Sequence, residues 1–337
     1  MGHFPQIKHL YLDDGIACEE FPVSFLSKFP SLVTLKITED CNAERPSLRF
    51  RADGFGLQRP SFNLETLHLN SGPMVEGITD VLEFYLQHAK RNGVKAFKSL
   101  KDLDVVLANE GDWNSMKALF EDEPALQSLS MDGGHCYLSV NKECGLTSSF
   151  IAGTIPGSHM ELDDFIPLSD YLIPSASTLN HLSLSFPIFW LDGALEITRF
   201  QNTVAIITDN LLAAMADRSV LKSLNLTFRL GFSEKFTCPN VRQWQGFASS
   251  LASREVFPSL KEVGLEMIFI IDGEHGGEDD GTREVVEEFQ DGELCTFGEK
   301  LDEALDPLHK RRDVKVAVSL DACTSWSQMC AIIQEVV

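Results

Sequence analysis

A short apolar pattern recurs along this chain, with leucine or another apolar residue at positions one, four and six of the motif. The stretch FPSLVTLKI contains a clear copy, in which Leu32, Leu35 and Ile37 occupy these positions. Positions four and six are two residues apart, so they lie on the same face of a β-strand. Eight copies follow in order, and their first residues are Ile7, Leu32, Leu64, Leu100, Leu126, Leu179, Leu221 and Leu260.

One strand per repeat predicts a solenoid, because a single strand and its return segment cannot bury an apolar face, whereas stacked neighbours can. The connections are long enough for the helical crossovers that parallel strands need. We therefore expect an α/β fold in which a curved parallel sheet carries helices on its convex side. Residues 1–337 would form a single domain of about eight or nine irregular repeats, the ninth being a degenerate copy with Val314, Val316 and Val318. A doubly wound α/β domain is the alternative, although no glycine-rich turn follows the first strand.

The same four residues, FPSL, open two of the repeats, at Phe29 and again at Phe257. FPSLVTLKI and FPSLKEVGL resemble the leucine-rich-repeat regions of fungal F-box-type proteins, over Phe4 to about Leu320. The resemblance implies the substrate-recognition part of a ubiquitin-ligase receptor, which binds a protein. The first repeat starts within ten residues of Met1, so we expect neither an F-box nor binding to a ligase adaptor.

The ninth motif position departs from the usual repeat, in which Asn or Cys ties successive turns together. The residues at that position are Gly15, Asp40, Gly72, Ala108, Gly134, Pro187, Arg229 and Ile268. Since a regular asparagine ladder is missing, the turns must be held in another way.

The chain is strongly acidic, with 28 Lys and Arg against 50 Asp and Glu and a formal net charge of −22. This balance argues against binding to nucleic acid or to an anionic membrane, and it favours a basic protein partner. The eight cysteines form no C-x-x-C pair, and no apolar run approaches a membrane span. We expect a cytoplasmic or nuclear protein.

Three segments stand apart from the repeats. Residues 135–159 interrupt them and predict an inserted loop, and residues 324–337 predict a capping helix. Residues 272–306 contain fourteen acidic residues against Arg283 and Lys300, which indicates an acidic loop and helix. This acidic segment is either solvated surface or a docking surface for a basic partner.

Local patterns predict the return segments. Thr79–Gly93 has the spacing of an amphipathic helix that Thr79 caps and Gly93 ends, and Glu19–Phe29 indicates a short helix. Four aromatic residues lie close together before and within a later return segment, and we expect them to form an exposed cluster: Phe186, Phe189, Trp190 and Phe200.

Catalytic signatures are absent from the sequence: it has no G-x-S-x-G elbow, no P-loop and no H-E-x-x-H. Acidic residues from Asp272 to Asp280 raise the alternative of a calcium site, but they lack the spacing of an EF-hand. His159, Glu161, Asp163 and Asp164 suggest either a metal contact or a solvated helix start. We expect no catalytic residue, no cofactor and no metal.

The repeat geometry instead offers a surface, because motif positions three, five and seven point to the concave face. These positions are nearly all polar. From them we select the candidate residues for binding a partner: Tyr11, Lys36, His68, Asp102, Asp104, Ser130, Asp132, His181, Ser183, Asn225, Glu262 and Glu266.

Three functional hypotheses remain. The first is a non-catalytic protein–protein interaction module that uses the concave face. The second is a free-standing scaffold or inhibitor protein, without a ligase link, that uses residues 272–306. The third is an enzyme of unrecognised type, with the segment 135–159 as a lid.

Overall fold

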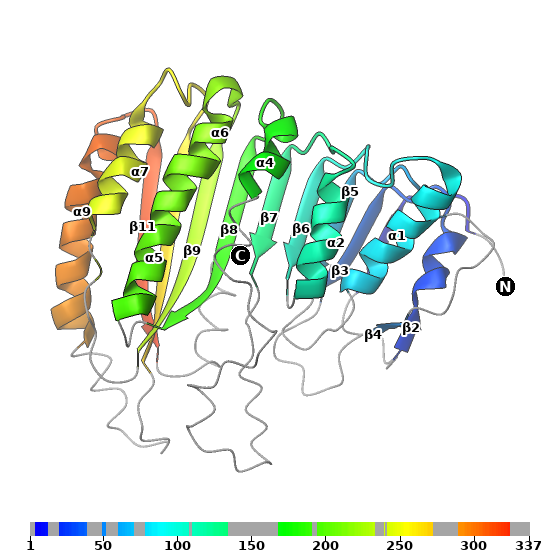
Figure 1. Cartoon of the computed structure of the whole chain (residues 1–337), viewed down its shortest axis with the longest axis horizontal. Helices are drawn as coiled ribbons and strands as arrows, with labels where there is room; N and C mark the ends of the chain where they lie inside the picture. Colours follow the sequence, from blue (N-terminus) through cyan, green and yellow to red (C-terminus); the bar gives the residue numbers. More distant parts are fainter. Residues whose placement is uncertain are drawn as a thin grey trace, which may run out of the picture. The chain divides into compact units, whose positions relative to one another are not determined.

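The computed structural model describes residues 4–12, 20–38, 49–51, 60–70, 78–107, 110–133, 168–190, 194–232, 239, 241–271 and 289–323. The fold is α/β, and nine strands hydrogen-bond in the order β1-β3-β5-β6-β7-β8-β9-β10-β11 (Figure 1). The described residues divide into two compact units, one up to Leu182 and one from Ser183.

The first unit contains short strands and the helices that connect them. The strands are β1 (His9–Leu12), β3 (Thr34–Thr38), β5 (Thr66–Asn70), β6 (Asp102–Val106) and β7 (Ser128–Asp132). The helices are the 3₁₀ segment η1 (Val23–Lys28), α1 (Ile78–Asn92), α2 (Glu110–Phe120), α4 (Leu168–Leu172) and the 3₁₀ segment η4 (Ile173–Ser175). Two further strands, β2 (Glu20–Pro22) and β4 (Arg49–Arg51), pair with each other.

The second unit contains longer strands. They are β8 (His181–Trp190), whose first two residues belong to the first unit, β9 (Ser223–Phe232), β10 (Glu262–Ile271) and β11 (Lys315–Cys323). The first return segment contains α5 (Ala194–Ile206), the π-helical η5 (Ile207–Leu212), α6 (Ala213–Met215) and the 3₁₀ segment η6 (Ala216–Arg218). The later ones contain α7 (Arg242–Ala252), the π-helical η7 (Gln290–Leu294) and α9 (Cys295–His309).

The strands pair in parallel with the motif in register. Leu35 pairs with Leu67, Leu67 with Leu103, and Leu103 with Leu129. Each of these leucines is fully or almost fully buried. Within each unit the long helices cover the same face of the strands (Figure 1). The predicted parallel sheet with helical crossovers is therefore confirmed.

The FPSL lead-in folds in the same way wherever it occurs. The amide of Leu32 donates to the carbonyl of Phe29, and the amide of Leu260 donates to the carbonyl of Phe257. All four of these side chains are buried, so the lead-in places two apolar groups under the start of each strand. Leu100 and Phe97, in the sequence FKSL, form the same turn.

Side chains of several kinds tie the turns together in place of an asparagine ladder. In the first unit, Ser61 Oγ donates to the carbonyl of Leu32 at 2.6 Å, and Ser175 Oγ donates to that of Pro124 at 2.7 Å. In the second unit the tie is the buried Arg311, which donates to the carbonyls of Leu251 and Phe257 at 2.8 and 2.6 Å.

Several local predictions are corrected. Phe186 and Phe200 are buried, not exposed, because both contact Phe228 of β9, at ring-centroid distances of 4.8 and 5.5 Å. The expected helix from Glu19 begins instead as strand β2, because its residues pair with β4. Helix α1 begins before Thr79, whose hydroxyl donates to Asp112 of α2.

At three repeats the ninth motif position lies inside a strand. Pro187, Arg229 and Ile268 lie inside strands β8, β9 and β10, because the chain there continues extended beyond the motif. The predicted insertion at 135–159, the candidate metal residues at 159–164, residues 272–288 of the acidic segment and the predicted cap at 324–337 lie outside the described residues.

Candidate functional site: the open face of the sheet

The face of the strands opposite the helices carries motif positions three, five and seven, and we refer to it as the open face. In β6 and β7, half-buried residues alternate with fully buried ones. The buried residues are the leucine-type positions on the helix side, and the half-buried ones are Asp102, Asp104 and Val106 in β6. The predicted division into an apolar and a polar face is therefore present in these strands.

Parallel pairing in register aligns the open-face residues of the first unit in rows across the sheet. One row consists of Tyr11, Lys36, His68, Asp104 and Ser130. The adjacent row consists of His9, Thr34, Thr66, Asp102 and Ser128. Cations, neutral donors and carboxylates thus lie side by side on one surface.

His68 lies among the charged groups of this surface, close to Asp104, Lys36 and Asp102. Its Nδ1 atom lies 3.8 Å from Asp104 Oδ2. The pKa of His68 is lowered, mainly because the imidazole is partly buried. The nearby carboxylates of Asp104 and Asp102 act to raise this pKa, whereas the charge of Lys36 lowers it further. The imidazole is therefore mainly neutral at pH 7, and the charges of this row are the Lys36 ammonium and the Asp104 carboxylate.

Hydrogen bonds between neighbouring strands hold the adjacent row. His9 Nδ1 and Thr34 Oγ1 are 3.0 Å apart, and Thr66 Oγ1 donates to Asp102 Oδ2 at 3.4 Å. Tyr11, in contrast, is 62% exposed at the edge strand β1. Because an exposed tyrosine combines an apolar ring with a polar tip, it suits contact with another protein.

The second unit has an open face with a different pattern of contacts. Lys315 Nζ lies 3.3 Å from Glu262 Oε1, and Thr227 Oγ1 donates to Glu266 Oε2 at 2.9 Å. Glu266 Oε1 and Ser185 Oγ are both buried, and neither has a hydrogen-bond partner among the residues that the structure describes. The Glu266 carboxylate oxygen could accept a further hydrogen bond, and the Ser185 hydroxyl could accept or donate one.

In β9 and β10, only the first half of the strand keeps this polar character. Arg229, Ile268 and Ile270 occupy open-face positions further along β9 and β10, and their exposed fractions are 1%, 0% and 3%. Arg229 Nη1 donates to the carbonyl of Phe186 at 3.2 Å. Beyond Thr227 and Glu266, both faces of these strands are therefore interior.

The candidate residues fall into two sets. The first unit carries Tyr11, Lys36, His68, Asp102, Asp104, Ser130, Asp132 and His181. The second unit carries Ser183, Asn225, Glu262 and Glu266. The structure aligns Lys36, His68 and Asp104 in one row, and it separates the two sets between the units.

Four relevant residues were missing from the candidate set. Ser185, which carries one of the unpaired oxygens, and Thr227, which donates to Glu266, both occupy motif position seven, which places them on the open face. Lys315 and Ser319 pair with Glu262 and Glu266 across the strands. The alternation of Val314, Val316 and Val318 predicts that Lys315 and Ser319 lie on the open face, but this degenerate copy is not one of the eight repeats that supply the candidate residues.

This surface is suited to binding through hydrogen bonds and charge pairs. Within the described part of the chain, no group of three or more His, Cys, Asp or Glu residues could hold a metal ion. Of the helices described, none has both the length and the apolar character needed to cross a membrane.

Comparison with known proteins adds no further constraint on the site. No protein-family model matches the chain, and no curated protein matches its sequence.

Proposed function

We propose that this chain is a leucine-rich-repeat solenoid that acts as a non-catalytic protein–protein interaction module. Three observations support the proposal: the motif leucines align in parallel register, the FPSL turn recurs, and the helices of each unit cover one face of its strands. The role implied by the sequence resemblance, substrate recognition in an F-box-type ubiquitin-ligase receptor, is part of this proposal.

The open face of the first unit is the proposed binding surface. The observation that carries this assignment is the row from Tyr11 to Ser130, in which five neighbouring strands present polar side chains at the same level. A matching partner would present basic groups to Asp102 and Asp104 and an apolar group to Tyr11.

Affinity capture from native extract, followed by mass spectrometry, tests this surface. The baits are the intact chain, D102K/D104K on the open face, and the matched control E83K/E121K, which makes the same charge change at exposed positions on α1 and after α2. We expect a partner that the intact chain and the control retain and D102K/D104K loses. Equal capture by all three baits, with circular dichroism showing that each is folded, would contradict the proposal.

A second candidate function is favoured by α9, whose exposed side carries Glu299, Asp302 and Glu303. In this alternative the chain is a free-standing scaffold or inhibitor that binds a basic partner through the acidic segment. The variant E299K/E303K separates the two candidates. It should lose the partner if α9 is the docking surface and retain it if the open face of the first unit is.

A further inference from the structure

Strand β11 ends the strand order of the sheet. It pairs with β10 from Lys315↔Glu262 to Cys323↔Ile270. Within the described residues no strand pairs with its other edge. From Lys315 to Asp321 this edge pairs with no other strand of the described residues, and such an edge is a template for another strand.

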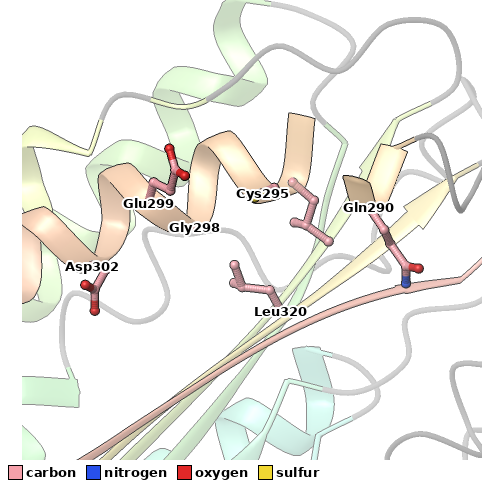
Figure 2. A pocket seen from close by; sticks show the side chains of 7 residues that line it. Gln290, Cys295, Gly298, Glu299, Asp302 and Leu320 are labelled. Carbon is pink, nitrogen blue, oxygen red and sulfur yellow. The ribbon is translucent and has the colours of Figure 1, made fainter. Parts of the chain in front are cut away.

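The apolar face of β11 lacks the cover that its neighbour has. Val263, Leu265 and Met267 of β10 are buried, whereas Val318, which pairs with Leu265, is 39% exposed. Beside this strand lies an open pocket of about 530 Å³, and Leu294 is part of its lining. Figure 2 shows the other lining residues: Cys295, Gly298, Leu320 and the polar Gln290, Glu299 and Asp302. As far as the described residues show, the backbone edge from Lys315 to Asp321 and the side chain of Val318 are available to a neighbour.

We propose that this edge pairs with the β11 edge of a second copy of the chain, antiparallel and centred on Val318. In that register Lys315 of each copy lies opposite Asp321 of the other, Val316 lies opposite Leu320, and Ala317 lies opposite Ser319. Two charge pairs and two apolar pairs form at once, related by a two-fold axis.

The charges select this register. A shift of two residues in either direction keeps the apolar side chains on the same face, but it places Lys315 opposite Ser319 or Cys323 and loses both charge pairs. Lys315 and Asp321 also lie on the same face, since they pair with Glu262 and Ile268 of β10. A two-fold contact closes on itself, so it produces a dimer and not a filament.

The apolar side gains cover in the same arrangement. Val316 and Leu320 of the second copy come to lie beside the exposed Val318, next to the pocket under α9. Residues 324–337 follow β11 directly in the sequence, and a contact of that segment with the edge is the alternative outcome of the tests. The experiments distinguish the two occupants.

Sedimentation velocity of the full chain, at protein concentrations from about 1 μM to about 100 μM in about 0.15 M salt, tests the charge pairing. Salt at this concentration screens the overall repulsion between the acidic copies. We expect reversible dimerisation. K315E or D321K should each weaken it by about tenfold, because each places like charges opposite one another twice, and K315E/D321K should restore it. The control R312E, at an exposed position outside the strand, should leave it unchanged.

A cysteine at the two-fold axis tests the register. Val318→Cys places a thiol opposite its own copy and should give a 318–318 disulfide, identified by mass spectrometry, whereas Val316→Cys faces Leu320 and should not link to itself. A wild-type chain that stays monomeric, for example because residues 324–337 cover the edge, would overturn the proposal. Failure of the double charge variant to restore the dimer would also overturn it.

Discussion

The two units build the same motif into strands of different length. Strands β3, β5, β6 and β7 have five residues each, whereas β8, β9 and β10 have ten. Strands β6 and β7 end with the motif, and their open-face residues remain half-buried. Strands β9 and β10 continue with mostly apolar residues, and both of their faces become interior. In β9 and β10 the added length is therefore interior, and only the first half of each strand is available to a partner.

The cause is visible in the residues that follow the motif. After Glu266, strand β10 continues as Met267, Ile268, Phe269, Ile270 and Ile271, all of them buried. A continuous apolar run of this kind is typical of strands that are covered on both faces. In β6, by contrast, alternation persists to the end, at the half-buried Val106.

The largest expected effect of a substitution is in the aromatic core of the second unit. Phe228 contacts Phe186, Phe200 and Trp244, at ring-centroid distances of 4.8, 5.5 and 5.6 Å. Phe228→Ala should lower the free energy of unfolding by about 5 kcal/mol, because truncating a buried aromatic leaves a cavity. Urea denaturation measures the change.

The matched substitution in the first unit should cost less. Phe97 is also buried, with Tyr85 at a ring-centroid distance of 5.8 Å, and Phe97→Ala should cost about 3 kcal/mol. Equal losses, or a larger loss for Phe97→Ala, would show that the two cores do not differ as described.

Open-face substitutions compare the two units directly. Ile268→Ala, on the buried second half of β10, should cost about 3 kcal/mol. Val106→Ala, at a half-buried open-face position, should cost less than about 1 kcal/mol. Thermal and urea unfolding of both variants check this order, and similar losses for the two would argue against an interior open face in β10.

The ties between turns should differ in strength. Arg311→Met removes a charged donor from the carbonyls of Leu251 and Phe257 and should cost about 2 to 3 kcal/mol. Ser61→Ala removes one neutral donor from the carbonyl of Leu32 and should cost about 1 kcal/mol. Hydrogen exchange at the amides of each turn provides a local readout. If exchange is unchanged in Arg311→Met, the arginine does not tie this turn.

The smallest effect is a pH dependence in the first unit. Burial lowers the pKa of His68, and burial together with Arg91 lowers that of His88. The unfolded chain therefore binds more protons below about pH 6.5, so the free energy of unfolding is fully retained above that pH and falls as the pH drops towards the folded-state pKa values. His68→Gln should reduce the slope of this fall, measured by urea denaturation between pH 7.5 and 5. An unchanged slope would exclude a contribution from His68.

The sequence was sufficient for the repeated part of the fold. The L-x-x-L-x-L spacing located the described strands of the main sheet, since positions four and six must share a buried face, and motif positions three, five and seven identified the open-face rows. The extension of β8 to β10 was missed because it lies beyond the six-residue motif, where Pro187, Arg229 and Ile268 suggested turns. The tie through Arg311 joins residues about sixty apart in sequence, so no local pattern could reveal it.

Photo-cross-linking in native extract is the most direct test of the proposed binding surface. A photoreactive phenylalanine analogue at Tyr11 replaces one exposed aromatic ring with another on the open face, and the same analogue at Glu83 lies on the exposed side of α1. The proposal predicts a cross-linked protein partner from position 11 and none from position 83. A partner that cross-links from position 83 and not from position 11 would contradict it.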